Sequence, residues 1–118
     1  MSVKLYLDTS IPSAYFDARV PIRQLVTQKW YENEVKNYEI CYSQLALIEI
    51  NRTRNSELRT KLLDLVLSND FKILDNTSEA EKLAELYIND KIIPEAEIED
   101  ALHIAIATVN KISLIASW

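Results

Sequence analysis

Short apolar segments with strand character alternate along the chain with segments of helical periodicity, and this alternation restricts the fold more than any other feature. The expected strands cover residues 3–7, 38–42, 71–74 and 112–116. Helices are expected to begin near residues 9–12 and 43, and to cover residues 22–36, 56–67, 78–89 and 95–110. Strands that alternate with helices in this way form a parallel sheet covered by helices. We therefore expect an α/β fold whose functional groups lie at the carboxyl ends of the strands.

The length of 118 residues, with 48% hydrophobic and 26% charged residues, predicts a single domain over residues 1–118 with one substantial core. The apolar stretches are too short for a membrane span, and the N-terminus lacks a secretory signal pattern, so we expect a cytoplasmic protein. The single cysteine, Cys41, has no internal disulfide partner and is expected to be a small core residue.

The sequence contains no glycine. Phosphate-binding loops of nucleotide hydrolases, dinucleotide-binding fingerprints and glycine-flanked serine nucleophiles all require glycine in their usual form. These enzyme classes are therefore excluded.

Three carboxylates lie in or beside apolar segments, where an isolated charge is costly to bury. Asp8 follows the first expected strand, Glu49 lies within the apolar run 45–50, and Asp100 opens the run 101–107. Because residues 101–109 are apolar nearly all round, we expect this helix to be buried and Asp100 to enter the core. If the fold gathers the three acids, a hard divalent cation is the simplest compensating charge.

Several polar residues near these acids are further candidates. Glu97 lies three residues before Asp100 on roughly the same helical face, and is a candidate outer metal ligand or partner of a metal-bound water. We interpret His103 as a hydrogen-bonded core histidine rather than a base or ligand. Thr9 and Ser10 either cap the following helix or hold Asp8 or a metal-bound water, and the two roles are compatible.

The net charge of −5 is unevenly distributed. Residues 1–61 contain nine Lys and Arg against seven acids, whereas residues 62–118 contain four against eleven. The basic residues between Arg52 and Lys61 are candidates for contact with RNA phosphates, but a solvated helix junction explains them at least as well. The aromatic residues Tyr15, Phe16 and Trp30 have helical spacing and are interpreted as packing residues rather than base-stacking ones.

The segments 5–10, 44–50 and 100–107 resemble, in order and spacing, the three acidic motifs of the PIN-domain nucleases. The run Asp-Ala-Leu-His-Ile-Ala from Asp100 is the most specific of them. The resemblance implies a PIN-like three-layer sandwich that cleaves RNA with Mg²⁺ or Mn²⁺ bound by Asp8, Glu49 and Asp100. Many similar chains are toxins of VapC-type toxin–antitoxin pairs, which implies an antitoxin partner.

The sequence departs from the family pattern after Ser117 and Trp118, where the family usually continues with Asp or Asn and a final helix or strand. We therefore expect a truncated C-terminal element and no fourth acidic ligand. Three acids suffice for one divalent ion with waters but are too few for a second ion. An exposed sheet edge would favour a homodimer.

Two alternatives remain open. A catalytically weak or inactive PIN-like module would keep the fold and serve in binding or regulation. A phospho-accepting receiver domain also places acids and Mg²⁺ on a parallel sheet, but its usual adjacent acids near the first strand and its late lysine have no clear equivalents here.

Overall fold

A computed structural model describes residues 3–118 and contains a four-stranded sheet in the order β3-β2-β1-β4. The strands are β1 (Val3–Leu7), β2 (Tyr38–Ser43), β3 (Lys72–Leu74) and β4 (Ile115–Ala116). Every pairing between neighbouring strands is parallel, which confirms the predicted α/β architecture. The last strand is shorter than expected, because β4 pairs with β1 only through Ile115 and Ala116.

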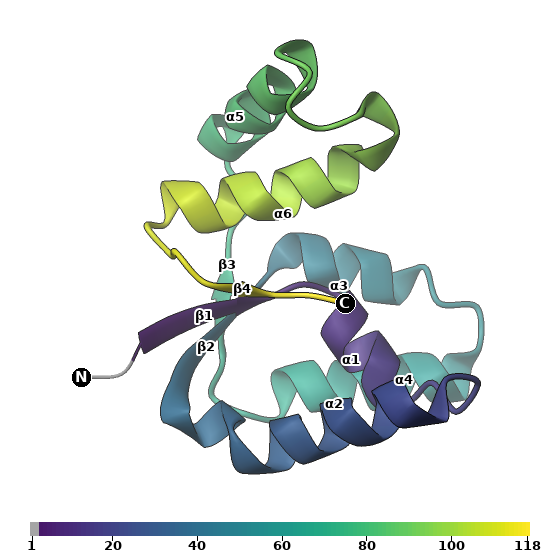
Figure 1. The fold of residues 1–118 in the computed structure, drawn as a ribbon. Helices are drawn as coiled ribbons and strands as arrows, with labels where there is room; N and C mark the ends of the chain where they lie inside the picture. The colour runs from purple at the N-terminus through teal and green to yellow at the C-terminus, as the bar shows by residue number, and fades with distance from the viewer. Residues whose placement is uncertain (1–2) are drawn as a thin grey trace.

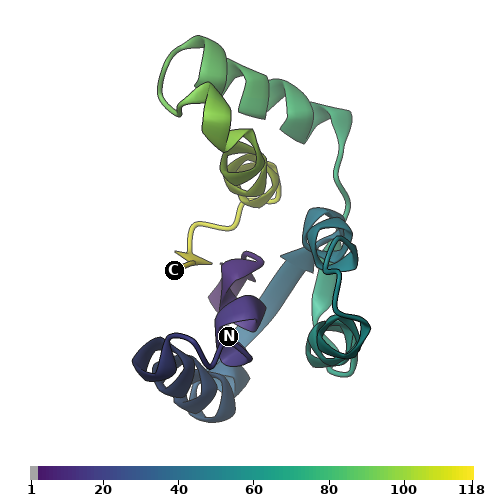
Figure 2. The ribbon, with the colours of Figure 1, turned by 90° about the vertical axis from the view of Figure 1, so that its right-hand side faces the viewer.

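Helices cover both faces of this sheet. Figure 1 shows α5 and α6 on one side and α1, α2 and α4 on the other, so the expected three-layer sandwich is confirmed. The α-helices are α1 (Ser10–Tyr15), α2 (Pro21–Asn33), α3 (Gln44–Asn51), α4 (Ser56–Leu67), α5 (Ser78–Asn89) and α6 (Ile98–Val109). Two 3₁₀ turns, η1 (Val35–Asn37) and η2 (Glu95–Glu97), lie between them. The view in Figure 2 shows the same two helical layers from the side.

The alternation of side chains along the strands produces two core clusters, one on each face of the sheet, rather than the single core expected from the sequence. Tyr6 packs with Cys41 and the residues of α5 and α6, whereas Leu5 and Leu7 pack with residues of α1, α2 and α4. Burying a side chain such as Leu7 completely stabilises the fold by about 1.5–3 kcal/mol. Cys41 is fully buried, which confirms it as a core residue.

The aromatic residues in and directly after α1, and in α2, pack as predicted. Tyr15, Phe16 and Trp30 contact the core that faces α4, and the ring of Tyr15 meets that of Phe16 edge to face at 4.9 Å. These side chains therefore stabilise the helical layer formed by α1, α2 and α4.

The helix starts agree with the sequence patterns to within about one residue except for α6, which begins at Ile98 after the 3₁₀ turn Glu95–Glu97 rather than at residue 95. Ser43 caps α3, as expected. The capping side chains of α4 and α5 belong to Asn55 and Thr77 rather than to Ser56 and Ser78, the first residues of the two expected helices. The cap must have an extended backbone and accept a hydrogen bond from the residue three positions later, and Asn55 and Thr77 satisfy both conditions.

The expectation that α6 is buried nearly all round was wrong. Ala101 and Ala105 are buried, but Ile104 is 37% exposed. The sheet and α5 cover only part of the circumference of α6, so the remaining face is open to solvent. Within residues 3–118, no helix combines the length and apolar composition needed to cross a membrane.

Candidate active site

A cavity of about 480 Å³ opens where the strands end, at the carboxyl edge of the sheet. Asp8 reaches it from the end of β1, Glu49 from α3, and Asp100 from the first turn of α6. Glu97 of the turn before α6 lines the same cavity. The fold therefore brings all four predicted acids to one cavity, although they are far apart in the sequence.

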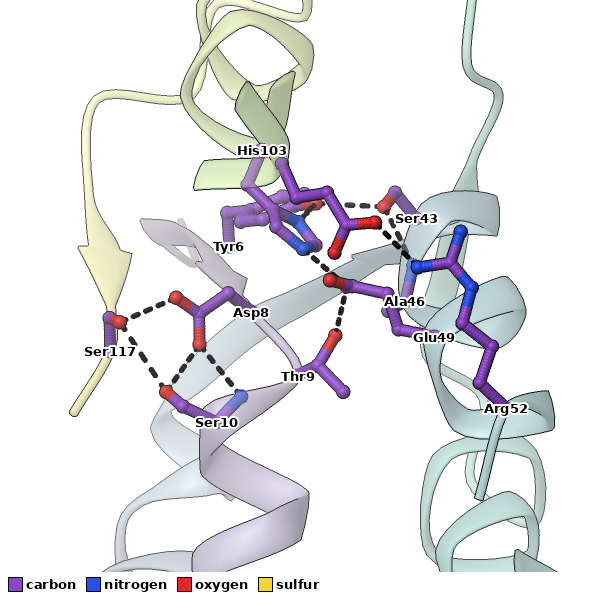
Figure 3. A network of polar contacts seen from close by, with 11 residues as sticks. Tyr6, Asp8, Thr9, Ser10, Ser43, Ala46, Glu49, Arg52, His103 and Ser117 are labelled. Carbon is purple, nitrogen blue, oxygen red and sulfur yellow. Dashed lines mark hydrogen bonds and ion pairs between the residues drawn. The ribbon is translucent and has the colours of Figure 1, made fainter. Parts of the chain in front are cut away.

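The carboxylate of Asp8 is held on both oxygens. Its Oδ1 accepts hydrogen bonds from the backbone N–H of Ser10 at 2.9 Å and from the Ser10 hydroxyl at 2.5 Å. Its Oδ2 accepts from the hydroxyl of Ser117 at 2.5 Å (Figure 3). Of the two roles predicted for Ser10, holding Asp8 is the one that the structure shows. These contacts orient Asp8 toward the cavity, and no cationic side chain among residues 3–118 pairs with it.

Glu49 has two hydrogen-bond donors on a single oxygen. Its Oε1 accepts from the hydroxyl of Thr9 at 2.5 Å and lies 2.6 Å from Nε2 of His103. Thr9 therefore binds Glu49 rather than Asp8, and its side chain does not cap α1. Burial raises the pKa of the Glu49 carboxyl, but side-chain hydrogen bonds with His103, Thr9 and Glu99 outweigh it and lower the pKa to about 2. Glu49 is thus ionised at neutral pH.

His103 connects Glu49 to the core. The ring is only 4% exposed, and its Nδ1 lies 2.5 Å from the hydroxyl of Tyr6. That hydroxyl donates to Oγ of Ser43 at 2.8 Å, and burial raises the pKa of Tyr6 well above its usual value. His103 is therefore the buried, hydrogen-bonded histidine that the sequence predicted, and it also lines the cavity.

Asp100 is exposed, which corrects the prediction that it enters the core. Burial on α6 begins at Ala101, so Asp100 stands at the rim where the helix starts. Glu97 is also exposed. These two carboxylates therefore remain in solvent beside the more enclosed pair, Asp8 and Glu49.

The basic residues after α3 are partly engaged within the chain. Nη1 of Arg52 lies 2.5 Å from Oε1 of Glu99, and Arg59 donates to the carbonyl oxygen of Thr53 at 2.7 Å. The Arg52–Glu99 pair is well exposed, so it contributes little to the stability of the fold. Arg52 can exchange Glu99 for another anion at little cost.

The chemistry of the donor set suits a hard divalent cation, because the cavity offers carboxylate oxygens. Within residues 3–118, however, no three His, Cys, Asp or Glu side chains are gathered closely enough to hold one ion. Asp8 and Glu49 are already oriented by their hydrogen bonds. A complete ligand set therefore requires the exposed Asp100 or Glu97 to rotate toward them.

The sequence profile of one protein family, described as PIN domain, matches residues 5–117. The chain belongs to the PIN-domain family. This match favours a PIN fold over the receiver-domain alternative. A comparison with curated protein sequences gives no match.

Two crystal structures resemble this PIN domain. Mycobacterium tuberculosis VapC20, described as a sarcin-ricin loop cleaving toxin, has a TM-score of 0.78 and 18% identity, with 97% of this chain and 88% of that chain covered. VapBC2 from Rickettsia felis, bound to a DNA fragment from its promoter, has a TM-score of 0.60 and 15% identity, with 98% of this chain and 99% of that chain covered. At such low identity, both similarities show a shared fold.

Sequence reasoning missed two residues of this polar network, Ser117 and Tyr6. Ser117 directly follows β4, just as Asp8 follows β1, so a search for polar residues after each strand could have found it. Tyr6 lies inside an apolar strand, and no local pattern marks its hydroxyl as a partner of His103.

Proposed function

We propose that this PIN domain is a metal-dependent endoribonuclease that hydrolyses phosphodiester bonds of RNA. Asp8, Glu49 and Asp100 are the proposed catalytic metal ligands, with Glu97 as an additional outer ligand. The observation that supports this most directly is that all four carboxylates line one cavity at the carboxyl edge of the sheet. Mg²⁺ and Mn²⁺ are the proposed ions, because both prefer oxygen ligands.

Asp8 and Glu49 are held by hydrogen bonds within the cavity, whereas Asp100 is exposed to solvent. A divalent ion would supply Lewis acidity toward a phosphate and lower the pKa of a water. Asp8 is oriented by Ser10 and Ser117, and Glu49 is kept ionised by His103 and Thr9. Asp100 is exposed, so its side chain can rotate toward an ion. In this scheme the protein supplies no covalent nucleophile.

We further propose that the domain is the toxin of a type II toxin–antitoxin pair, with an antitoxin protein as its partner. VapC20, which shares the fold, is described as a toxin that cleaves the sarcin-ricin loop. The VapBC2 structure adds a second member of the same fold. A cytoplasmic location accords with a cellular RNA substrate, and the homodimer stays a prediction.

RNA cleavage by the purified chain tests the proposal. We expect a broad pool of structured and single-stranded RNA to be cut with Mg²⁺ or Mn²⁺, and a chelator to abolish cleavage. Losing even an outer partner of a metal site costs about 10- to 100-fold, so Glu49→Gln and Asp8→Asn should each lose at least about 100-fold.

Matched controls make the same chemical changes outside the cavity. Glu85→Gln on α5 and Asp64→Asn on α4 alter exposed carboxylates and should leave cleavage unchanged. Circular dichroism checks that every variant folds. If the folded wild type cuts no RNA with either ion, the nuclease proposal is wrong.

A catalytically inactive binding module is the second candidate, favoured by the lack of three gathered ligands within residues 3–118. In that case the chain should bind RNA without cutting it. A gel-shift measurement beside the cleavage assay separates the two functions.

A further inference from the structure

His103 bridges two elements that the sequence separates widely. Its Nε2 lies 2.6 Å from Oε1 of Glu49 on α3, and its Nδ1 lies 2.5 Å from the hydroxyl of Tyr6 on β1. Figure 3 shows the ring between these two groups. The ring of Tyr6 packs against that of His103 edge to face, with centroids 5.6 Å apart. The imidazole is therefore restrained on both sides.

The position of the hydrogen on the His103 ring follows from the hydrogen-bond partners of its two nitrogens, Glu49 and Tyr6. An ionised carboxylate only accepts hydrogen bonds, so Nε2 must donate to Glu49. With Tyr6 donating to Ser43, Nδ1 donates to the oxygen of Tyr6. If the hydroxyl hydrogens run the other way, from Ser43 to Tyr6 and on to Nδ1, Nε2 still carries its hydrogen. Both arrangements therefore leave the bond to Glu49 unchanged.

Glu49 uses only one of its oxygens in these contacts. The hydroxyl of Thr9, at 2.5 Å, donates to the same Oε1 as Nε2 of His103. Two donors on Oε1 fix the direction of the carboxylate and leave Oε2 as the better oxygen for a divalent ion. A buried donor that orients a ligating carboxylate preserves the geometry that a metal site needs.

We propose that His103 is a positioning residue, which holds Oε1 of Glu49 through Nε2 so that Oε2 is offered to a divalent ion in the cavity. Tyr6 and Ser43 hold the opposite side of the ring. The presence of an ion in the cavity depends on the function proposed above, whereas the orientation of Glu49 by His103 does not.

Two nearly isosteric variants separate positioning from packing. His103→Gln places an amide N–H close to the former Nε2 and retains a donor to Glu49, whereas His103→Met has a similar shape and no donor. The affinity of the whole chain for Mn²⁺, measured by electron paramagnetic resonance, is the main readout. We expect His103→Met to weaken Mn²⁺ binding by about 10- to 100-fold and His103→Gln to recover most of that loss.

Equal Mn²⁺ affinities of the Gln and Met variants, both folded, would overturn the positioning role. Asp64→Asn on α4 is the control for nonspecific binding to surface carboxylates and should leave the affinity unchanged.

A double-mutant cycle tests the contact without any metal. His103→Met, Glu49→Met, which has no oxygen acceptor for Nε2, and the double variant are unfolded with urea in the presence of a chelator. We expect a coupling of about 2- to 150-fold in the unfolding equilibrium constant, as is usual for residues in direct contact. Additive effects would refute the His103–Glu49 interaction.

The outcomes also distinguish this inference from the proposed function. One outcome is coupling in the cycle and a difference in Mn²⁺ affinity between the Gln and Met variants, but no RNA cleavage by the wild type. That outcome would support the positioning role of His103 and reject the nuclease proposal. Coupling without any Mn²⁺ binding by the wild type would reject the proposed metal site, and with it the role of His103 in presenting Oε2.

Discussion

Replacing Ser43 by Ala should destabilise the fold through two separate contacts of one hydroxyl. Ser43 is completely buried at the junction of β2 and α3. Its Oγ accepts the N–H of Ala46 at 3.4 Å, which caps α3, and the hydroxyl of Tyr6 at 2.8 Å. The substitution therefore removes a helix cap and an acceptor of a buried tyrosine together.

The expected loss can be worked from these two contacts. Loss of a serine cap costs about 1 kcal/mol, and the long bond to Ala46 argues against a larger value. A buried hydroxyl without a partner costs about 1–3 kcal/mol, but Tyr6 keeps its contact with Nδ1 of His103, which can accept from Tyr6 when only Nε2 carries a ring hydrogen, so we take the lower end. The sum is about 2 kcal/mol. With an unfolding entropy of about 2.1 cal/mol/K per residue over 118 residues, the melting temperature should fall by about 8 °C.

Urea unfolding and calorimetry measure the two quantities independently. Thr77→Ala is the matched control, because Thr77 caps α5 through a similar bond to Ala80 at 3.2 Å and has no tyrosine partner among its contacts in residues 3–118. It should lose only about 1 kcal/mol, or about 4 °C. If Ser43→Ala is no more destabilising than Thr77→Ala, the Tyr6–Ser43 bond contributes nothing and the reasoning is wrong.

Three further predictions concern metal, RNA and pH. Mn²⁺ should raise the melting temperature of the wild type, since it binds only the native state, and Asp8→Asn should reduce that rise; an equal rise in both would place the ion elsewhere. Replacing Arg52 and Arg54 by Ala should weaken RNA binding and flatten its dependence on salt, whereas an unchanged salt slope would assign both residues to a solvated surface. Burial raises the pKa of Tyr6, Tyr31 and Tyr42, and that of Tyr31 reaches about 12. Their contribution to the free energy of unfolding is therefore complete below the unfolded pKa of about 10 and is lost as the pH rises through the folded pKa. An ultraviolet titration of the folded chain should show these tyrosines ionising late, and a single step near pH 10 before unfolding would contradict this.

The order and type of the elements were readable from the sequence because they depend on local patterns. Alternating apolar segments and helical periodicities predicted β1, β2 and the order of the helices, and the parallel arrangement followed from that alternation. Asp8 after β1 could be placed at the carboxyl edge of the sheet for the same reason. The boundaries of some elements differ from those expected. The strand β4 is an example, because its pairing with β1, and not its composition, decides where it begins.

The polar contacts of the site depend on the tertiary structure, because they join residues that no local pattern connects. Tyr6 and His103 are 97 positions apart, and Asp8 and Ser117 are 109 apart. Whether such side chains meet depends on strand register and on where α6 crosses the sheet. The exposure of Asp100 was decided in the same way: the sequence determines that a carboxylate opens an apolar helix, but the packing of α6 places that first turn beyond the cover of the sheet and α5.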